Sequence, residues 1–318
     1  MGGSDMTFYI LRRVVQATVV LFGVTLVVFI LIHLLPGGPR ALLGPHVSAQ
    51  QVHAFMVANG YTRPVWVQYG TYVSQVARGN FGYSYHYNET VGALLGQDLP
   101  KSLVLVGLAI GISLTIAVPV GVLQAFRRNT AIDHALTGAA FVGYSMPVFW
   151  LATLLILVFA VKIHAFPPEA PQGATVGAVF SQPLALVLPV ATLTIVTVAL
   201  FTRYMRSSAV DSLVQDYIRT ARSKGASESR ILVRHVLRNS ILPIITLIGL
   251  SLPAILSGAV ITETVFNYPG MGLLFWNAAT SHDYPTLMGV TIAVGAATVV
   301  GSLLADVLYS IVDPRVRY

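Results

Sequence analysis

Long apolar segments alternate with polar ones along this chain, and six of them approach the ~20 apolar residues needed to cross a bilayer. The six predicted membrane spans are 14–35, 102–123, 136–160, 184–201, 241–260 and 287–312. None of them contains a Lys or Arg, each of which would cost about 2.5–3.5 kcal/mol at the centre of a span. The pattern therefore predicts an all-α integral membrane protein with six transmembrane helices.

The composition supports this class. Hydrophobic residues make up 55% of the 318 residues, whereas charged residues make up only 10%. A soluble domain would carry roughly 25% charged residues, so this chain has too few to cover its surface for water. It has no cysteine, which excludes disulfides, thiolate metal sites and a cysteine nucleophile.

The positive charges are unevenly distributed between the two sides of the predicted bundle. If the spans alternate, 14 of the 19 Lys and Arg residues fall on one side, namely residues 12, 13, 127, 128, 203, 206, 219, 222, 224, 230, 234, 238, 315 and 317. By the positive-inside rule this side is cytoplasmic, and both termini lie inside. Because topology and anionic lipid account for the net charge of +7, we expect no nucleic-acid partner.

The segment after the first span, residues 36–101, is longer than a connector needs to be and is predicted to lie outside. Ser48 is a good N-cap for one helix, which Gly60 would end. Pro64 is suited to open a second helix with an apolar stripe. The insert is either a cap packed on the bundle or a docking surface for a molecule delivered from outside. Residues 163–183, rich in Pro, Gly and Ala, are predicted to be a plain outer loop.

The most polar segment lies between the fourth and fifth spans. Residues 216–224 suit a short helix, with Asp216 at its positive end and basic residues at its negative end. Gly225 is a good left-handed stop, and Ser227 with Glu228 then favours a second helix over 228–239. The segment is either a lipid-anchoring hairpin or a strut that transmits a partner's motion to the fifth span, which Pro253 and Gly258 allow to bend.

Several kinds of chemistry are missing from the sequence. None of the three lysines, Lys101, Lys162 and Lys224, lies in a phosphate-binding P-loop motif, so no ATP site is expected. No zinc-protease or nucleophile-elbow motif occurs, which disfavours a membrane enzyme. His33 is predicted to be a hydrogen-bonded interface residue rather than a ligand.

Acidic residues are almost absent from the predicted spans. Asp306 is the one acid inside a span, ~9 Å from its cytoplasmic end, and is either a polar functional site or half of a structural pair. Glu263 is predicted to be solvated just beyond the fifth span. A stand-alone channel or secondary carrier remains a competing class, but a proton-coupled carrier would bury more acids than these.

Several motifs together resemble a known family, the permease subunits of binding-protein-dependent ABC importers of the dipeptide, oligopeptide and nickel branch. They are YILRR at 9–13, LLPG at 34–37, GNFGYS at 79–84, RYMRSS at 203–208, QDYIRTARSKG at 215–225, RHVLRNSILP at 234–243, ETVFNYPGMG at 263–272 and DPRVRY at 313–318. The resemblance covers nearly the whole chain and is closest to the B-type subunits.

The resemblance implies a type I importer permease fold. Residues 1–13 would be a cytoplasmic N-terminus and 14–35 the first span. Residues 36–101 would be an extracytoplasmic helical insert on the face that meets the binding protein. Residues 102–318 would be the permease core, with a cytoplasmic coupling loop at 203–240.

The coupling loop of this family docks on the partner ATPase. The residues implied for that role are Asp216, Tyr217, Arg219, Thr220, Ala221, Lys224 and Gly225. The general motif of the family reads Glu-Ala-Ala, three residues, then Gly. Here Arg219-Thr220-Ala221 occupies the first three positions, so only Ala221 and Gly225 match, and Asp216 would substitute for the acidic residue.

The implied partners are a homologous second permease, two ATPase domains and an extracytoplasmic binding protein. ATP and Mg²⁺ would be held by the ATPases, and no cofactor is expected in this chain. The implied function is ATP-driven import of di- or oligopeptides across the cytoplasmic membrane. Nickel, glutathione or another small solute is the alternative cargo.

Overall fold

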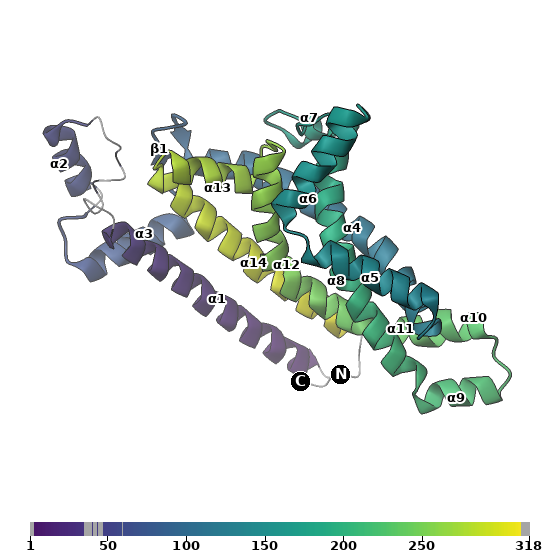
Figure 1. Ribbon diagram of the computed structural model, residues 1–318. Helices are drawn as coiled ribbons and strands as arrows, with labels where there is room; N and C mark the ends of the chain where they lie inside the picture. Colours follow the sequence, from purple (N-terminus) through teal and green to yellow (C-terminus); the bar gives the residue numbers. More distant parts are fainter. Residues whose placement is uncertain (1–2, 35–39, 41–42, 44–46, 59, 313–318) are drawn as a thin grey trace. The chain divides into compact units, whose positions relative to one another are not determined.

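The computed structural model describes residues 3–34, 40, 43, 47–58 and 60–312 of the chain (Figure 1). The chain divides into two compact units. Of the described residues, the first unit contains those up to 102 and 269–300, and the second contains 103–268 and 301–312. Two long helices, α4 (Val91–Phe126) and α14 (Tyr284–Val312), contribute to both units.

The first unit contains α1 (Gly3–Leu34), α2 (Ala49–Ala58), α3 (Val65–Ala77), the start of α4, α13 (Met271–Thr280) and most of α14. Two short strands, β1 (Tyr83–Ser84) and β2 (Glu89–Thr90), pair antiparallel. A small core joins α4, α13 and α14 through Val91, Leu95, Leu274 and Val290. The buried Asp283 carboxylate fastens β1 to the start of α14, because it accepts hydrogen bonds from Ser84 Oγ at 2.5 Å and Thr286 Oγ1 at 2.7 Å.

Both helices predicted after the first span are present in this unit. The hydroxyl of Ser48 accepts a hydrogen bond from the Gln51 amide at 3.3 Å, and Gly60 follows α2 with a φ of 71°. Helix α3 begins directly after Pro64, as predicted.

Helix α3 packs on α1 through aromatic side chains. The Tyr69 ring meets Phe22 and Phe29 edge-on, at centroid distances of 5.4 and 5.2 Å. His33 Nε2 lies 3.0 Å from Gln68 Oε1 on α3, so its prediction as a hydrogen-bonded interface residue is confirmed. Helix α3 of the insert is therefore packed against the first helix rather than detached from it.

The second unit is built around α8 (Pro183–Leu213). It also contains α5 (Ala131–Ser145), α6 (Val148–Leu155), η2 (Ile156–Lys162), α7 (Val176–Phe180) and α12 (Leu242–Val265). Its core draws on α4, α6, α8, α12 and the residue after α12, through Leu105, Ala152, Leu188, Ala259 and Phe266 respectively. Gly121 sets the crossing of α4 and α8, because a Cβ at that position would lie only 2.6 Å from Met205 Cβ.

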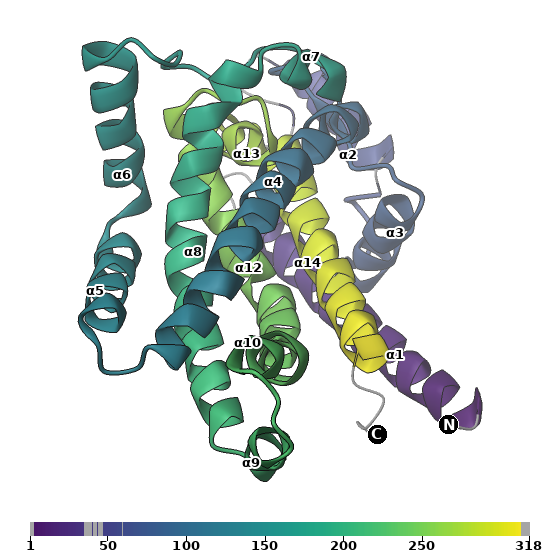
Figure 2. The ribbon, with the colours of Figure 1, turned by 90° about the vertical axis from the view of Figure 1, so that its right-hand side faces the viewer.

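The third predicted span is not one straight helix, which corrects the sequence interpretation. Helices α5 and α6 are bent by 102° at Met146 and Pro147. Figure 2 shows the break between them. Proline disfavours the helical conformation in the residue before it, and Met146 accordingly has an extended ψ of 129°. Among the described residues, five helices are long and apolar enough to cross a membrane, and the bent pair is a sixth if it counts as one span.

Two charged residues expected in water are buried instead. Helix α4 begins at Val91, so Lys101 lies inside it, is 2% exposed and pairs with Asp98 Oδ1 at 2.7 Å. Helix α12 continues to Val265, so Glu263 lies within it and is fully buried. Both errors arose because the helices continue past the apolar segments that predicted them.

The segment at 163–183 is also more ordered than the plain loop predicted. It contains the short helix α7, which Thr175 caps by accepting from the Ala178 amide. The Ala170 amide donates to the Phe266 carbonyl at 2.8 Å, and Gln172 Nε2 donates to the Asn267 carbonyl at 2.7 Å. The segment is thus fastened to the end of α12.

Candidate functional site

A polar hairpin, residues 214–240, extends α8 in the second unit (Figure 2). It consists of α9 (Asp216–Ser223), a turn, α10 (Glu228–Arg230), η3 (Ile231–Val236) and α11 (Leu237–Ser240). The prediction of a short helix from 216 is confirmed. The helix predicted over 228–239 is also present, but its middle turn, η3, is a wider π-helix.

The turn of the hairpin is fixed by local hydrogen bonds. Gly225 has a φ of 77°, as predicted, and the Ala226 amide donates to the Ala221 carbonyl at 3.1 Å. Ser227 then caps α10 by accepting from the Arg230 amide at 3.4 Å. A left-handed residue that ends one helix, followed by an N-cap that starts the next, reverses the chain within a few residues.

An ion pair closes the turn from one helix to the next. Arg222 Nε and Nη2 donate to the two carboxylate oxygens of Glu228 at 2.9 and 3.0 Å. These hydrogen bonds raise the pKa of the Arg222 guanidinium. Both carboxylate oxygens of Glu228 thus accept from Arg222, which joins α9 to α10 across the turn.

The inner face of the hairpin is apolar and packs within its own unit. Ile218 is fully buried and Ala221 is 9% exposed. They form one cluster with Ile231 and Val236 of the second arm, Ala125 at the end of α4 and Ala209 of α8. Ala221 therefore contributes to the packing of the hairpin rather than to an exposed docking face. Sequence reasoning missed Ile218, although its spacing of three from Ala221 indicated a shared helix face.

The outer face of α9 carries the other predicted residues. The side chain of Asp216 is 97% exposed and that of Arg219 is 77% exposed. Thr220, Lys224 and Gly225 are exposed as well. Tyr217 is less free, because its hydroxyl lies 2.5 Å from Ser212 Oγ at the end of α8. The structure thus separates the predicted set into exposed residues and residues that hold the hairpin on α8.

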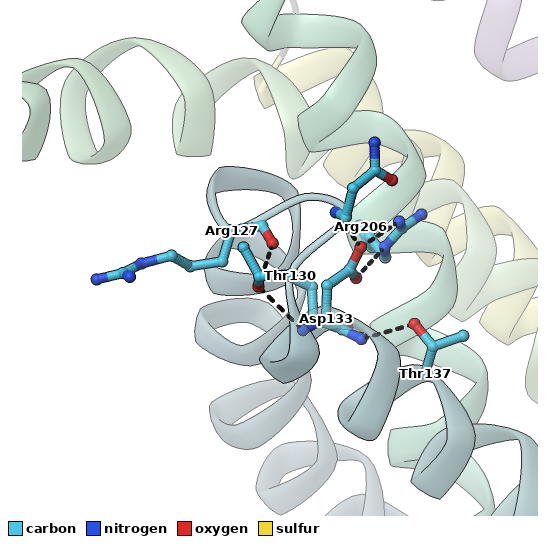
Figure 3. Close-up of polar contacts among 7 residues, drawn as sticks. Arg127, Thr130, Asp133, Thr137 and Arg206 are labelled. Atoms are coloured by element: carbon cyan, nitrogen blue, oxygen red, sulfur yellow. Dashed lines mark hydrogen bonds and ion pairs between the residues drawn. The ribbon is translucent and has the colours of Figure 1, made fainter.

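A buried ion pair anchors α8 two turns before the hairpin (Figure 3). Arg206 Nε and Nη2 donate to Asp133 Oδ1 and Oδ2, both at 2.7 Å. The Asp133 side chain is 1% exposed and that of Arg206 is 30% exposed. The Asn129 amide also donates to Asp133 Oδ2, at 3.0 Å, and Thr130 is the N-cap of α5.

This pair links the turn between α4 and α5 to α8. Sequence analysis did not single it out, because its members are 73 residues apart and each alone is a surface-type residue. The local signal was an acid three residues before the third predicted span, near a helix start, where the helix dipole favours a negative charge.

Two further expectations concern single sites. Asp306 lies in α14, but its side chain is outside the part of the chain that the structure describes. Within the described residues, no group of three or more His, Cys, Asp or Glu side chains could hold a metal ion.

Comparison with known proteins identifies the family. The family described as the binding-protein-dependent transport system inner membrane component matches residues 117–318, and its N-terminal component matches residues 6–106. The chain belongs to this family. It is therefore a multi-pass component of the cytoplasmic membrane, and the predicted all-α permease fold is confirmed.

Relatives align with this inner membrane component from end to end. The oligopeptide transport system permease protein AppB of Bacillus subtilis is 38% identical, with 98% of this chain and 100% of that protein covered. OppB of Haemophilus influenzae, an oligopeptide permease protein, is 35% identical, with 98% and 100% covered. The dipeptide permease protein DppB of Escherichia coli K12 is 33% identical, with 98% and 99% covered.

A solved structure has a similar fold. A chain in inward-facing structures of the MetNI methionine ABC transporter superposes with a TM-score of 0.57 and 15% identity. The superposition covers 69% of this chain and 96% of that one. At this identity the similarity bears on the fold alone.

Proposed function

We propose that this protein is a transmembrane subunit of an ATP-driven importer that moves di- or oligopeptides across the cytoplasmic membrane. One observation carries the proposal. The chain aligns over 98% of its length with peptide permease proteins. The hairpin with its exposed polar face agrees with this function. An exposed polar face on a packed, apolar base is suited to a soluble partner.

Energy enters from partner subunits in this proposal. The sequence has no P-loop lysine, so ATP and Mg²⁺ belong to two ATPase domains that contact α9. A homologous second permease completes the pathway, and an extracytoplasmic binding protein delivers the peptide. ATP binding closes the ATPases, displaces α9 and opens the paired bundles to the outside, and hydrolysis resets them.

The packing suggests how such a displacement spreads. Helix α8 is continuous from Pro183 to Leu213, and the hairpin shares an apolar cluster with the ends of both α4 and α8. A push on α9 therefore acts on two long helices together, not on the fifth span alone. The Asp133–Arg206 ion pair also connects the turn between α4 and α5 to α8, so this turn should move together with the two helices.

The proposed topology follows the charge distribution. Residues 1–13 and the polar hairpin lie in the cytosol, residues 14–35 form the first span, and residues 36–101 lie outside. Helices α2 and α3 then belong to the face that meets the binding protein. Residues 102–318 form the permease core, with the coupling loop at 203–240.

Transport by the complete complex tests the cargo. The chain, its second permease, both ATPases and the binding protein would be reconstituted in vesicles, and ATP-dependent uptake of a labelled tripeptide would be measured. Labelled nickel and glutathione serve as competing cargoes, and a non-hydrolysable ATP analogue serves as the control. Uptake of the tripeptide supports the proposal, whereas uptake of nickel or glutathione alone would replace the peptide as the cargo.

A further inference from the structure

The exposed surface of the polar hairpin is strongly cationic. It carries six basic residues, namely Arg219, Arg222, Lys224, Arg230, Arg234 and Arg238, all of them exposed. Its acids are Asp216 and Glu228, so a net charge of four positive remains on residues 214–240. A docking surface of this kind is positively charged and not merely hydrophilic.

Neither acid of the hairpin holds Arg219 or Lys224 firmly. Glu228 is held by Arg222 through both of its oxygens. Asp216 lies 3.7 Å from Arg219, and both side chains are largely exposed, so that pair is weak. Arg219 and Lys224 are therefore available to an external partner.

The outer face of α9, which we call its ridge, allows a partner protein to approach closely. Because Ile218 and Ala221 face inward, Asp216, Arg219, Thr220 and Ser223 lie on the opposite side of the helix. Thr220 and Ser223 are small, and their hydroxyls donate to carbonyls of the helix itself at 3.0 Å. Arg219 is thus the long charged side chain that projects from this ridge, with Lys224 at its end.

Anionic lipid is a poor candidate for this surface. Arg203 lies over the ring of Tyr144 at 5.2 Å, next to the predicted membrane end of α8 at Phe201. Helix α8 continues unbroken to Leu213, which is roughly 18 Å further along its axis. The headgroup layer is only about 5–8 Å thick and the Debye length about 8 Å, so α9 lies beyond the main reach of lipid charge.

We propose that the partner surface that receives α9 is acidic, with carboxylates placed to meet Arg219 and Lys224. This inference rests on the proposed function, in which α9 docks on an ATPase. It assigns the sign of charge on that ATPase, a property that the docking itself leaves open. Charge complementarity of this kind fixes the register of an interface and excludes wrong partners.

The test compares charge variants during assembly in a neutral detergent. The chain with Arg219→Glu and Lys224→Glu, and the chain with both residues changed to Gln, would be co-purified with the second permease and the ATPases at 50 to 500 mM NaCl. The matched control is Arg63→Glu with Arg78→Glu, which makes the same change of charge on exposed residues of the first unit. A second readout uses Ser223→Cys, the only cysteine in this chain, for cross-linking to the ATPase.

We expect the Glu variant to weaken ATPase retention at least tenfold and the Gln variant to weaken it less, since like charges repel across an interface. Retention of the native complex should fall as salt is raised, and the control should behave as the native chain does. Acidic residues of the ATPase at the cross-linked site should be the counterparts of Arg219 and Lys224. Changing those acids to Lys should therefore restore retention of the Glu variant.

Three outcomes separate the possibilities. If Ser223→Cys cross-links to the ATPase but charge reversal and salt have no effect, the acidic surface is refuted while docking stands. If the variants assemble normally in neutral detergent and lose activity only in anionic vesicles, α9 binds lipid and the inference is overturned. If the native chain retains no ATPase and Ser223→Cys does not cross-link to it, the proposed function itself fails.

Discussion

At the scale of single residues, the Asp133 carboxylate shows what a long-range contact contributes. It is buried, accepts two hydrogen bonds from Arg206 and receives a third from the Asn129 amide. Removing one partner of a buried pair leaves the other charge uncompensated, which typically costs about 3–5 kcal/mol. Because Arg206 is 30% exposed, water relieves part of that cost here.

We therefore expect Asp133→Asn to reduce the free energy of unfolding by about 2–3 kcal/mol, below the cost of breaking a fully buried pair. Thermal unfolding of the purified chain in detergent would measure the change. Arg127→Gln is the control, since Arg127 lies in the same turn with an exposed side chain. A melting temperature of Asp133→Asn equal to that of the control would show that the pair contributes no stability.

Gly225 gives a second prediction at this scale. Nothing lies within 4 Å of a Cβ added there, so the penalty comes from its φ of 77° alone. We expect Gly225→Val to cost about 1 kcal/mol or more in backbone strain, while the protein stays inserted. Because the turn sets the position of α9, ATPase assembly or the coupling of hydrolysis to uptake should weaken.

The matched variant for this position is Gly225→Asn, because Asn tolerates a left-handed conformation and should retain most of the coupling. Ser74→Val in α3 should leave assembly intact. Uptake assays and ATPase co-purification would be compared for the three variants. Native transport and assembly by Gly225→Val would reduce Gly225 to a tolerant loop position.

Four of the residues that sequence reasoning placed correctly share one property. Ser48, Gly60, Gly225 and Ser227 act within a few residues of themselves, so local rules for caps and turns identify them. Asp133 and Ser84 act on partners 73 and 199 residues away. No local pattern encodes such a pairing.

At the scale of elements, apolar stretches identified the helices but not their full lengths. Helix α4 begins at Val91 and α8 continues to Leu213, both well beyond the apolar segments. The polar ends are helical because neighbours within the same unit bury them, as Lys101 and Ala209 show. Such burial is a tertiary effect that a hydropathy pattern does not contain.

The hairpin gives a prediction at this scale. Ala221→Asp would bury a charge in the cluster formed with Ile218 and Ile231, so the inner face should detach from the end of α8. We expect faster tryptic cleavage within residues 219–238, measured by limited proteolysis of the purified chain. The control is Thr220→Asp, which adds the same charge on the exposed neighbour. Equal cleavage of the two variants would show that the hairpin does not depend on this packing.

At the scale of the whole molecule, the class of protein and its family were easier to predict from the sequence than the arrangement of the site. Low charge content and six apolar segments predicted a membrane bundle, and motifs spread along the chain predicted the permease family. The bend between α5 and α6 was not predicted, although Pro147 and the residue before it were its local signal. The residues predicted to dock on the ATPase formed one group in the sequence. Only the packing showed that Ala221 is buried within the hairpin while Asp216 and Arg219 are exposed.

The orientation of the chain is the last prediction. The excess of Lys and Arg places the polar hairpin in the cytosol and α3 outside. The native chain has no cysteine, so single cysteines report their positions without background. Ser229 and Ser74 are both exposed, and neither caps a helix as Ser227 does, so Ser229→Cys and Ser74→Cys should fold normally.

In intact cells, or spheroplasts where an outer membrane is present, an impermeant maleimide should label Ser74→Cys only. Permeabilisation should expose Ser229→Cys as well. Labelling of Ser229→Cys from outside would invert the topology and remove the hairpin from the reach of any cytosolic ATPase.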